Sequence, residues 1–430
     1  MRPVFQLSAL FCIALLGACD KNPIDLPTPS SQPNILFIIA DDMGKDAING
    51  FSEGSIKPNT PNIDAIRNSG LSFSNFWVYP TCSPTRASII TGKYGYRTGV
   101  KWAADVLSNS ETILHQYINA QTNNSYATAV IGKWHLSGDA DPTFNPESFG
   151  MDHYAGLLRG TVQDYYQWQL TEDGIGTLQT EYATTVFTDL SINWVNEQSK
   201  PWFLWLAYNA PHVPFHVPPS EMHSQGNLPA YTAGLDATPY YMAAIEAMDY
   251  QIGRLLDNIP ADERANTLII FIGDNGTPNE VAQAPYSSNT VKGTLFQGGI
   301  NTPMFISGAG VSRTGTDNSL ICGTDLYATI AQVAGVSASQ IHDSKSFKAL
   351  FSGSAAIRDF QYSEMDDGTT DAWTIGNGAY KLTVDANGNQ TMYDLTNDPY
   401  EQDELNLSAL SAQQSAAKAA LEAELLLIRN

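Results

Sequence analysis

A thiol, a proline and an arginine lie within five positions of one another in the first quarter of the chain. Cys82, Pro84 and Arg86 belong to the run Cys-Ser-Pro-Thr-Arg-Ala-Ser-Ile-Ile-Thr-Gly, residues 82–92. The proline predicts an extended conformation for Ser83. The arginine keeps its positive charge and can hold a developing negative charge beside the cysteine. The alternative is a cysteine that is simply buried and an arginine in a surface ion pair.

Two apolar runs end in side chains that offer oxygen ligands. Residues 34–42 read Asn-Ile-Leu-Phe-Ile-Ile-Ala-Asp-Asp, and residues 267–275 read Thr-Leu-Ile-Ile-Phe-Ile-Gly-Asp-Asn. Each run predicts a strand buried on both faces of a parallel sheet, with polar residues just beyond the strand end, where open α/β sheets place their sites. These residues form an all-oxygen set suited to calcium rather than zinc: Asp41, Asp42, Asp274 and Asn275. Taken singly, either pair is also typical of a helix cap.

Three further segments carry lysines and histidines beside glycine, proline or tryptophan. Gly-Lys-Trp-His-Leu contains Lys133 and His135, Ala-Pro-His-Val-Pro-Phe contains His212, and Lys-Gly-Thr, followed by Gly-Gly, contains Lys292. Taken one at a time, such residues are usually solvated lysines, core histidines and turns. The other histidines lack such context, although His216 is close enough in sequence to His212 to line the same cleft.

In their order along the chain, these segments resemble the motifs of the type I, formylglycine-dependent sulfatases, an arylsulfatase-like family of the alkaline phosphatase superfamily. The resemblance spans residues 34–405, since Tyr-Asp-Leu and Asp-Pro-Tyr-Glu near the C-terminus match the closing motif. It implies that a formylglycine-generating maturation enzyme oxidises Cys82 and that the hydrated aldehyde supplies the nucleophilic oxygen. It also implies a calcium ion with the following ligands: Asp41, Asp42, Asp274, Asn275 and an oxygen of residue 82.

The resemblance implies roles for the basic residues as well. Arg86, Lys133 and Lys292 would surround the sulfur atom with positive charge. His212, with Lys292, would protonate the departing alcohol oxygen, and His135 would take a proton from formylglycine 82 so that sulfate is eliminated. The expected function is therefore that of a sulfuric ester hydrolase. Two alternatives stay open: a phosphate or phosphonate ester hydrolase on the same fold, and a non-catalytic glycan-binding lipoprotein.

The substrate expected from this resemblance is a sulfated glycan or oligosaccharide. The chain departs from the family pattern at residues 43–46, which read Met-Gly-Lys-Asp, at Gln297 and at Asn301, positions that lie near the substrate in that pattern. These departures leave the particular sugar open. Four aromatic side chains are candidate platforms for stacking sugars, although aromatic residues more often belong to the core: Trp77, Tyr79, Trp102 and Trp168.

Apolar strand-like runs alternate with helical stretches over most of the chain. Residues 201–208 predict a strand, and residues 240–259 have apolar side chains at helical spacing. This alternation predicts an α/β fold with a mostly parallel sheet flanked by helices, and the resemblance implies a large, alkaline-phosphatase-like domain. We expect this catalytic domain to cover residues 34–349.

The pattern changes in the last part of the chain. Residues 373–395 contain Gly-Asn-Gly and Asn-Gly-Asn turns between short alternating runs and predict antiparallel hairpins. Residues 408–428 are rich in alanine and leucine and predict a closing helix. We therefore expect a small C-terminal antiparallel-sheet domain over residues 350–430.

The N-terminus has the features of an export signal. Arg2 precedes an apolar stretch over residues 7–16 and the tripeptide Gly-Ala-Cys, which resembles a bacterial lipoprotein signal. We expect a signal peptide over residues 1–18, a lipid on Cys19, and a flexible tether over residues 19–33. The protein would then be an exported bacterial lipoprotein, anchored to the membrane in the periplasm or at the cell surface. The alternative is an ordinary signal peptide.

Charge and cysteine content limit the partners. The 430 residues carry a formal net charge of −22, which argues against binding to nucleic acid or to anionic membrane surfaces. A sulfated polymer would therefore have to bind in a local cationic pocket. Cys12 is removed with the signal peptide, and Cys19 and Cys82 have other fates, so Cys322 is left alone and no disulfide is expected.

Overall fold

The computed structural model describes residues 32–138 and 144–429. These residues belong to one compact unit, Gln32–Asn430. The predicted signal peptide, Cys19 and most of the predicted tether lie outside the described residues, and the domain boundary expected between residues 349 and 350 stays a prediction. In the part of the chain that is described, no helix is long and apolar enough to cross a membrane.

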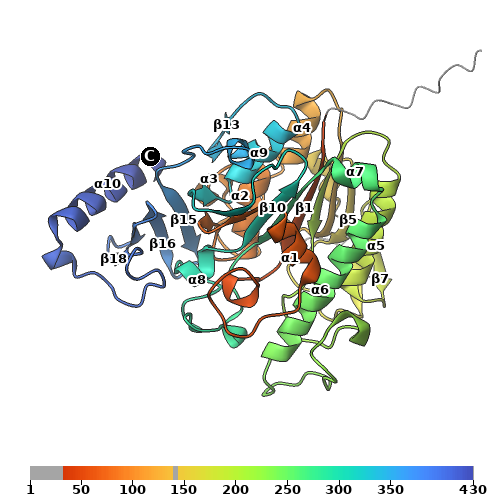
Figure 1. Cartoon of the computed structure of the whole chain (residues 1–430), viewed down its shortest axis with the longest axis horizontal. Helices are drawn as coiled ribbons and strands as arrows, with labels where there is room; N and C mark the ends of the chain where they lie inside the picture. Colours follow the sequence, from red (N-terminus) through yellow and green to blue (C-terminus); the bar gives the residue numbers. More distant parts are fainter. Residues whose placement is uncertain (1–31, 139–143, 430) are drawn as a thin grey trace, which may run out of the picture. The chain divides into compact units, whose positions relative to one another are not determined.

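A ten-stranded sheet runs through this unit (Figure 1). Its five central strands are parallel, and in spatial order they are β9 (Thr267–Gly273), β1 (Asn34–Ala40), β8 (Trp202–Ala207), β4 (Ala127–Lys133) and β5 (His153–Leu157). The outer strands are β10 (Met304–Gly308), β2 (Leu71–Phe73) and β11 (Gly315–Asp317) beside β9, and β6 (Trp168–Glu172) and β7 (Ile175–Gln179) beside β5. The mostly parallel sheet predicted from the sequence is confirmed.

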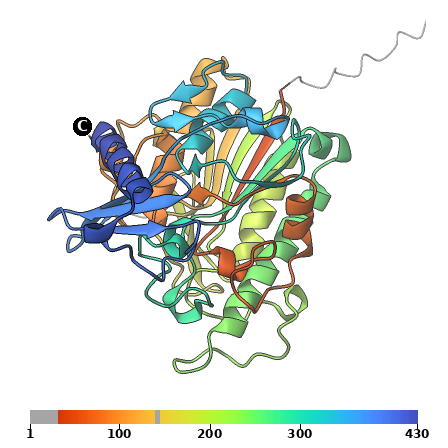
Figure 2. The ribbon, with the colours of Figure 1, turned by 60° about the vertical axis from the view of Figure 1, so that its left-hand side comes forward.

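Helices cover both faces of the sheet, because the central strands are apolar on both sides (Figure 2). In β1, Ile35, Phe37 and Ile39 belong to one hydrophobic core, whereas Leu36 and Ile38 belong to the other. The first core is completed by α2 (Cys82–Thr91), α4 (Leu114–Gln121) and α9 (Asp325–Val333). The second is completed by α1 (Pro61–Asn68), α5 (Ala183–Asn196) and α6 (Thr238–Asn258). Burial of every residue of β1 explains its central place in the sheet.

A separate four-stranded antiparallel sheet follows near the C-terminus. Its strands are β15 (Gln361–Asp366), β16 (Asp371–Gly376), β17 (Tyr380–Asp385) and β18 (Gln390–Asp394), paired in sequence order. The closing helix α10 (Ala412–Arg429) packs against this sheet through Leu421 and Leu425. The predicted hairpins and helix are confirmed, but the helix begins later than expected, because Asn406 caps a short helix, η6 (Leu407–Ala409), ahead of it.

Short elements occupy the connections. They are η1 (Lys45–Ala47), β3 (Phe76–Trp77), α3 (Gly95–Thr98), η2 (Pro146–Phe149), η3 (Ser220–Met222), α7 (Ala261–Ala265), η4 (Asn279–Val281), α8 (Gln297–Ile300), β12 (Ile321–Cys322), β13 (Gln340–Ile341), β14 (Ser344–Lys345) and η5 (Lys348–Phe351). Strand β12 pairs with β3, and β13 pairs with β14. Within the described residues, Cys82 and Cys322 are both buried and free.

The segment that begins at Cys82 is helical, which corrects the extended conformation predicted for Ser83. Cys82 is the first residue of α2, and Pro84 lies in its first turn. Backbone amides in the first turn of a helix have no partner inside the helix, so a proline costs little there. The helix ends at Gly92, whose φ of 68° is the left-handed conformation that favours glycine. All ten residues of α2 are buried.

Candidate active site

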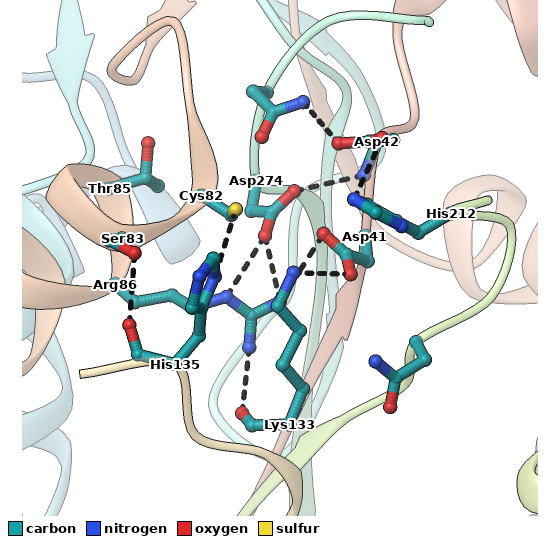
Figure 3. Close-up of polar contacts among 12 residues, drawn as sticks. Asp41, Asp42, Cys82, Ser83, Thr85, Arg86, Lys133, His135, His212 and Asp274 are labelled. Atoms are coloured by element: carbon teal, nitrogen blue, oxygen red, sulfur yellow. Dashed lines mark hydrogen bonds and ion pairs between the residues drawn. The ribbon is translucent and has the colours of Figure 1, made fainter. Parts of the chain in front are cut away.

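Three parallel strands end at the same edge of the sheet and bring charged side chains together. Asp41 follows β1, Lys133 is the last residue of β4, and Asp274 follows β9. Figure 3 shows these side chains converging with those of Cys82 and Arg86, which come from α2. This is the edge where open α/β sheets form their sites.

Two of the buried carboxylates are held by cations that are equally buried. Lys133 Nζ lies 2.6 Å from Asp41 Oδ2. Arg86 donates to Asp274 Oδ2 from Nε at 3.0 Å and from Nη2 at 2.7 Å, and its Nη1 donates to the Lys133 carbonyl at 2.8 Å. Because these groups fix one another, the positive charges have defined positions before any ligand arrives.

Asp42 connects the remaining candidate residues. Its Oδ2 lies 2.5 Å from Lys292 Nζ and 3.5 Å from His212 Nε2, and its Oδ1 accepts a hydrogen bond from Asn275 Nδ2 at 2.8 Å. Its backbone N–H donates to Asp274 Oδ1 at 3.0 Å. The residue has a left-handed φ of 67°, which is uncommon for a residue other than glycine. The end of β1 therefore turns sharply at the point where the site is assembled.

Two buried oxygen atoms of the site, Asp41 Oδ1 and Asn275 Oδ1, have no hydrogen-bond partner among the described residues. Ligand atoms of Asp41, Cys82 and Asp274 lie within 4.8 Å of one another. An unpartnered buried oxygen costs free energy, and carboxylate and amide oxygens are the ligands that calcium prefers. The residues therefore fit a calcium ion. Since the acids and cations of the site balance, such an ion would leave the site positive, which suits an anionic substrate.

Cys82 and His135 are adjacent. Cys82 Sγ lies 3.2 Å from His135 Nδ1, and Ser83 Oγ donates to the His135 carbonyl at 2.9 Å. On its other side, the imidazole packs against Gly160, where a Cβ atom would lie only 2.3 Å from Nε2. Cys82 also stands at the N-terminus of α2, where unpaired backbone amides favour anions. The surroundings of residue 82 therefore combine a basic nitrogen with a position suited to negative charge.

His212 is oriented by its own loop. Its Nδ1 donates to the Val213 carbonyl at 2.7 Å, because a carbonyl can only accept, and this leaves Nε2 facing Asp42. The Tyr165 hydroxyl donates to the His212 carbonyl at 2.8 Å. His216 stacks on the Tyr165 ring with 3.8 Å between ring centres. His216 therefore supports the loop of His212 and takes no part in the ion pairs of the site.

Burial and neighbouring charges set the protonation states. Burial lowers the pKa of His135 well below its ordinary value, so this imidazole is neutral at neutral pH and can accept a proton. Burial also lowers the pKa of His212, although Asp42 opposes the shift. For Lys292, burial favours the neutral amine, but the Asp42 carboxylate outweighs it and raises the pKa. Burial raises the pKa of the Cys82 thiol, so an unmodified Cys82 is a poor nucleophile.

Every side chain that the sequence singled out for catalysis or metal binding lies at this edge of the sheet. The aromatic candidates behave differently. Trp77, Tyr79 and Trp168 are at most 2% exposed and belong to the core, so their prediction as sugar platforms was wrong. Trp102 is half-buried and lies against Gly293, next to Lys292, and it stays a candidate.

Two residues at the site were missed by sequence reasoning. Asn209 lies just beyond β8, and neither polar atom of its buried side chain has a hydrogen-bond partner within the described ranges. Its place after an apolar strand, like that of Asp41, is the signal that could have identified it. No local pattern marks Gly160, because its importance comes from a contact with His135 that exists only in the folded chain.

Known proteins resemble this chain in sequence and in fold. It is 28% identical over 378 residues to the uncharacterized sulfatase YdeN of Escherichia coli (strain K12), a match that covers 74% of the chain and 65% of YdeN, so the chain spans less than two thirds of that relative. It is 26% identical over 411 residues to the arylsulfatase of Klebsiella aerogenes, covering 71% of the chain and 87% of the relative.

Two solved structures share the architecture. Ps i-CgsB in complex with k-i-k-neocarrahexaose has a TM-score of 0.73 and 25% identity, covering 88% of this chain and 89% of that one. The PsFucS1 sulfatase from Pseudoalteromonas sp. has a TM-score of 0.73 and 21% identity, covering 93% and 91%. The family model described as Sulfatase matches residues 33–336. Because this match takes in most of the chain, including the strands and loops that carry the site, the chain belongs to the sulfatase family.

Proposed function

We propose that this protein hydrolyses sulfate esters of sulfated glycans or oligosaccharides, using a formylglycine derived from Cys82 and a calcium ion. The observation that carries the proposal is the meeting of the Cys82 side chain with the carboxylates of Asp41 and Asp274, within 4.8 Å. Two relatives support a carbohydrate substrate. Ps i-CgsB forms a complex with k-i-k-neocarrahexaose, and the human N-acetylgalactosamine-6-sulfatase is 26% identical over 343 residues, covering 71% of this chain and 62% of the relative.

The metal ligands follow from the unpaired oxygens. When bound, a calcium ion would polarise the sulfate oxygens. Asp41 and Asn275 each offer a buried oxygen that accepts no hydrogen bond from the described residues, and Asp41 Oδ1 lies 3.9 Å from Arg86 Nη2. The full set of ligands that we propose is Asp41, Asp42, Asp274, Asn275 and an oxygen of residue 82.

Lys133, Arg86 and Lys292 supply the positive charge that binds the sulfate group and stabilises the charge that develops on it. Lys133 and Arg86 are fixed by their ion pairs with Asp41 and Asp274. Charges that need no rearrangement during the reaction stabilise a transition state better than mobile ones. The salt bridges of the site therefore hold its cations in fixed positions.

Two histidines divide the proton transfers. His135 is neutral and accepts a proton at Nδ1 from the side chain of residue 82, the step that releases sulfate. On the leaving-group side, Lys292 is protonated and His212 presents Nε2, since its Nδ1 is committed to the Val213 carbonyl. Lys292 delivers its proton to the departing alcohol oxygen; His212 carries a proton at Nε2 only as the imidazolium, the form that the Asp42 carboxylate favours, and in that form it serves as the second donor.

The test uses the whole protein co-produced with a formylglycine-generating enzyme. Sulfate release from sulfated oligosaccharides and an aryl sulfate is measured for the wild type and for Cys82→Ala, beside matched phosphate esters. We expect the variant to lose turnover and keep its melting temperature. Appreciable sulfatase activity in Cys82→Ala contradicts the proposal, and a strong preference for phosphate favours the phosphoester alternative. Mass spectrometry of the peptide around residue 82 checks the modification, and a persistent thiol without turnover favours a glycan-binding protein.

We propose further that the chain is exported and anchored to a bacterial membrane by a lipid on Cys19. The supporting observation is the apolar stretch that ends in Gly-Ala-Cys. Fractionation of cells that produce the wild type or Cys19→Ala tests this proposal. We expect the wild type in the membrane fraction and the variant outside it, and the same soluble distribution for both proteins contradicts it.

A further inference from the structure

A cavity of about 330 Å³ has a lining that shares no residue with the candidate site described above. Lys45 of η1, Ser72 of β2 and Gln297 of α8 line one part of it, and Tyr400, which follows β18, lines another. None of the candidate catalytic or metal-binding residues is among its lining residues. A cavity of this volume is at the lower end of the range for small-molecule sites and accommodates one sugar ring.

The cavity contains a buried cation, Lys45, that forms no ion pair with an acid of the described residues, although the Glu53 carboxylate is near enough to oppose the effect of burial on its pKa. Lys45 is 3% exposed, and its Nζ donates to the Ser74 carbonyl and to Asn301 Oδ1, each at 2.6 Å. Both acceptors are uncharged, and Lys45 forms no ion pair with a carboxylate of the described chain. Burial lowers the pKa of Lys45 to about 7, which reflects the cost of this arrangement. An ammonium group has three N–H donors, so one donor remains for a ligand.

Two amide side chains hold Lys45 in place. Asn301 Nδ2 donates to Gln297 Oε1 at 2.8 Å, while Asn301 Oδ1 accepts from the lysine. Gln297 Nε2 is buried and has no hydrogen-bond partner among the residues described. Gln297, Asn301 and the segment 43–46 that contains Lys45 are among the places where the sequence departs from the family pattern, and the fold joins Lys45, Asn301 and Gln297 into one hydrogen-bonded group that lines this cavity.

The remaining walls suit a sugar. Phe51 lies under the ammonium group, with Nζ 5.0 Å from the ring centre, and Tyr286 and Tyr400 meet edge to face at 5.8 Å. Aromatic faces and hydroxyl groups are the surfaces against which sugar rings pack and form hydrogen bonds. Glu53 also lines the cavity. Its carboxylate can accept hydrogen bonds from sugar hydroxyls, but it repels a ligand with several negative charges.

We propose that this cavity binds an acidic sugar unit, a single sugar ring that carries one sulfate or carboxylate group, with its anion on Lys45. The ligand's negative charge compensates the buried ammonium, and the ring contacts Phe51 and the tyrosine pair. This site is a binding subsite in addition to the proposed catalytic one. It requires neither formylglycine nor turnover, so its failure and that of the proposed function are distinguishable.

The test measures binding of glucose 6-sulfate, glucuronate and neutral glucose by calorimetry at mildly acidic pH, where Lys45 is protonated. The proteins are the wild type, Lys45→Met, Lys292→Met to weaken the catalytic site, and Lys418→Met as a surface-charge control. The wild type used here has an unmodified Cys82, so the ligands are not consumed. We expect Lys45→Met alone to weaken binding of at least one acidic sugar about tenfold or more. We expect neutral glucose to bind the wild type no more tightly than the acidic sugars bind Lys45→Met.

The variant is expected to fold, because both acceptors of Lys45 keep another donor: Asn301 Oδ1 accepts from the Phe76 backbone N–H, and the Ser74 carbonyl accepts from Asn301 Nδ2. Circular dichroism and thermal unfolding check this. A crystal structure of the wild type with the tighter-binding sugar should show that sugar beside Lys45. Comparing the sulfated with the carboxylated sugar tells whether the site prefers a sulfate or a carboxylate group. The proposal is overturned if Lys45→Met, folded, binds both acidic sugars as the wild type does. It is also overturned if neither acidic sugar binds, or if binding is lost only in Lys292→Met.

Discussion

Lys292 and Asp42 form an ion pair of 2.5 Å although they are 250 residues apart in the sequence. The lysine side chain is 24% exposed and the aspartate side chain 1%, so the pair links the open side of the site to its buried floor. His212 faces the same carboxylate oxygen at 3.5 Å. One carboxylate therefore organises both groups that we propose to act on the leaving oxygen.

Replacing Lys292 with alanine should lower kcat/KM for sulfate ester hydrolysis by about 10² to 10³, because a fixed positive charge and a proton donor are both lost. The fold should survive, since Asp42 keeps its contact with Asn275. Steady-state kinetics with an aryl sulfate measures the effect, and the control is Lys418→Ala, at a half-buried lysine of α10 that pairs with Glu422. An unchanged kcat/KM in Lys292→Ala contradicts the assigned role.

Gly160→Ala should displace His135, because the new methyl group would lie 2.3 Å from the imidazole. We expect kcat to fall by about 10² or more, in the range typical of losing a general base, with little change in melting temperature. The double variant Gly160→Ala/His135→Ala distinguishes this mechanism from a general disturbance. If the glycine acts through His135, the double variant is no slower than His135→Ala alone. A further loss of similar size in the double variant rules out this explanation.

Removing calcium should lower both activity and thermal stability. The buried carboxylates of Asp41, Asp42 and Asp274 would lose a shared ligand, while their ion pairs remain. We expect a chelator to lower the melting temperature by a few degrees, and added calcium to restore it more effectively than zinc. Asp41→Asn should remove most of this response. A melting temperature that is the same with chelator and with calcium speaks against the metal site.

His115 should make the fold sensitive to acid. Its imidazole is fully buried against Phe203, with 4.5 Å between ring centres, and burial lowers its pKa from 6.5 to about 3. Between these values the unfolded chain binds more protons than the folded one, so the free energy of unfolding falls as pH drops from 6.5 toward 3. By about pH 4 the loss attributable to His115 should be on the order of 3 kcal/mol.

Denaturant unfolding across this pH range, with wild type and His115→Phe, measures that contribution. The phenylalanine keeps an aromatic ring at the position and cannot be protonated, so the variant should lose less stability in acid. Some slope will remain, because burial also lowers the pKa of His216, to about 4. Parallel curves for the two proteins would show that protonation of His115 is not coupled to unfolding.

Breaking the buried pair of Lys381 and Glu401 should destabilise the C-terminal sheet. Lys381 Nζ lies 2.5 Å from Glu401 Oε1, and Oε2 of the same carboxylate accepts a hydrogen bond from the backbone of Gln297 at 2.5 Å. Lys381→Met leaves a buried carboxylate without its cation and should cost about 3–5 kcal/mol. Adding Glu401→Gln should recover part of this loss. Unfolding curves measure both, and no recovery in the double variant argues against the charge as the cause.

Much of the fold follows from local patterns. The apolar runs of β1 and β9 identified two central strands, because a strand buried on both faces is apolar at every position. Helical spacing identified α6, because a helix buried on one face has apolar residues every three to four positions. The same runs located Asp41 and Asp274. The helical conformation of Ser83 was missed, since the restriction that Pro84 imposes was outweighed by the start of α2.

The remaining features depend on contacts between distant segments. That Trp77 and Trp168 would be buried could not be read from their neighbours, because a tryptophan serves a core and a sugar site equally well. The pairing of Lys133 with Asp41 and of Lys292 with Asp42 likewise exists only after β1, β4 and the loop before α8 meet. Sequence motifs nominated these residues individually, and the fold determines which acid meets which base.

Cys82 is 2% exposed, and every residue of α2 around it is buried. An enzyme that oxidises this cysteine needs access to the segment on both sides of it, and the finished fold offers none. The oxidation that we propose for Cys82 would therefore have to precede the burial of α2 against the sheet. On this proposal, a molecule that folds first would keep its thiol and would have to unfold before the modification could take place.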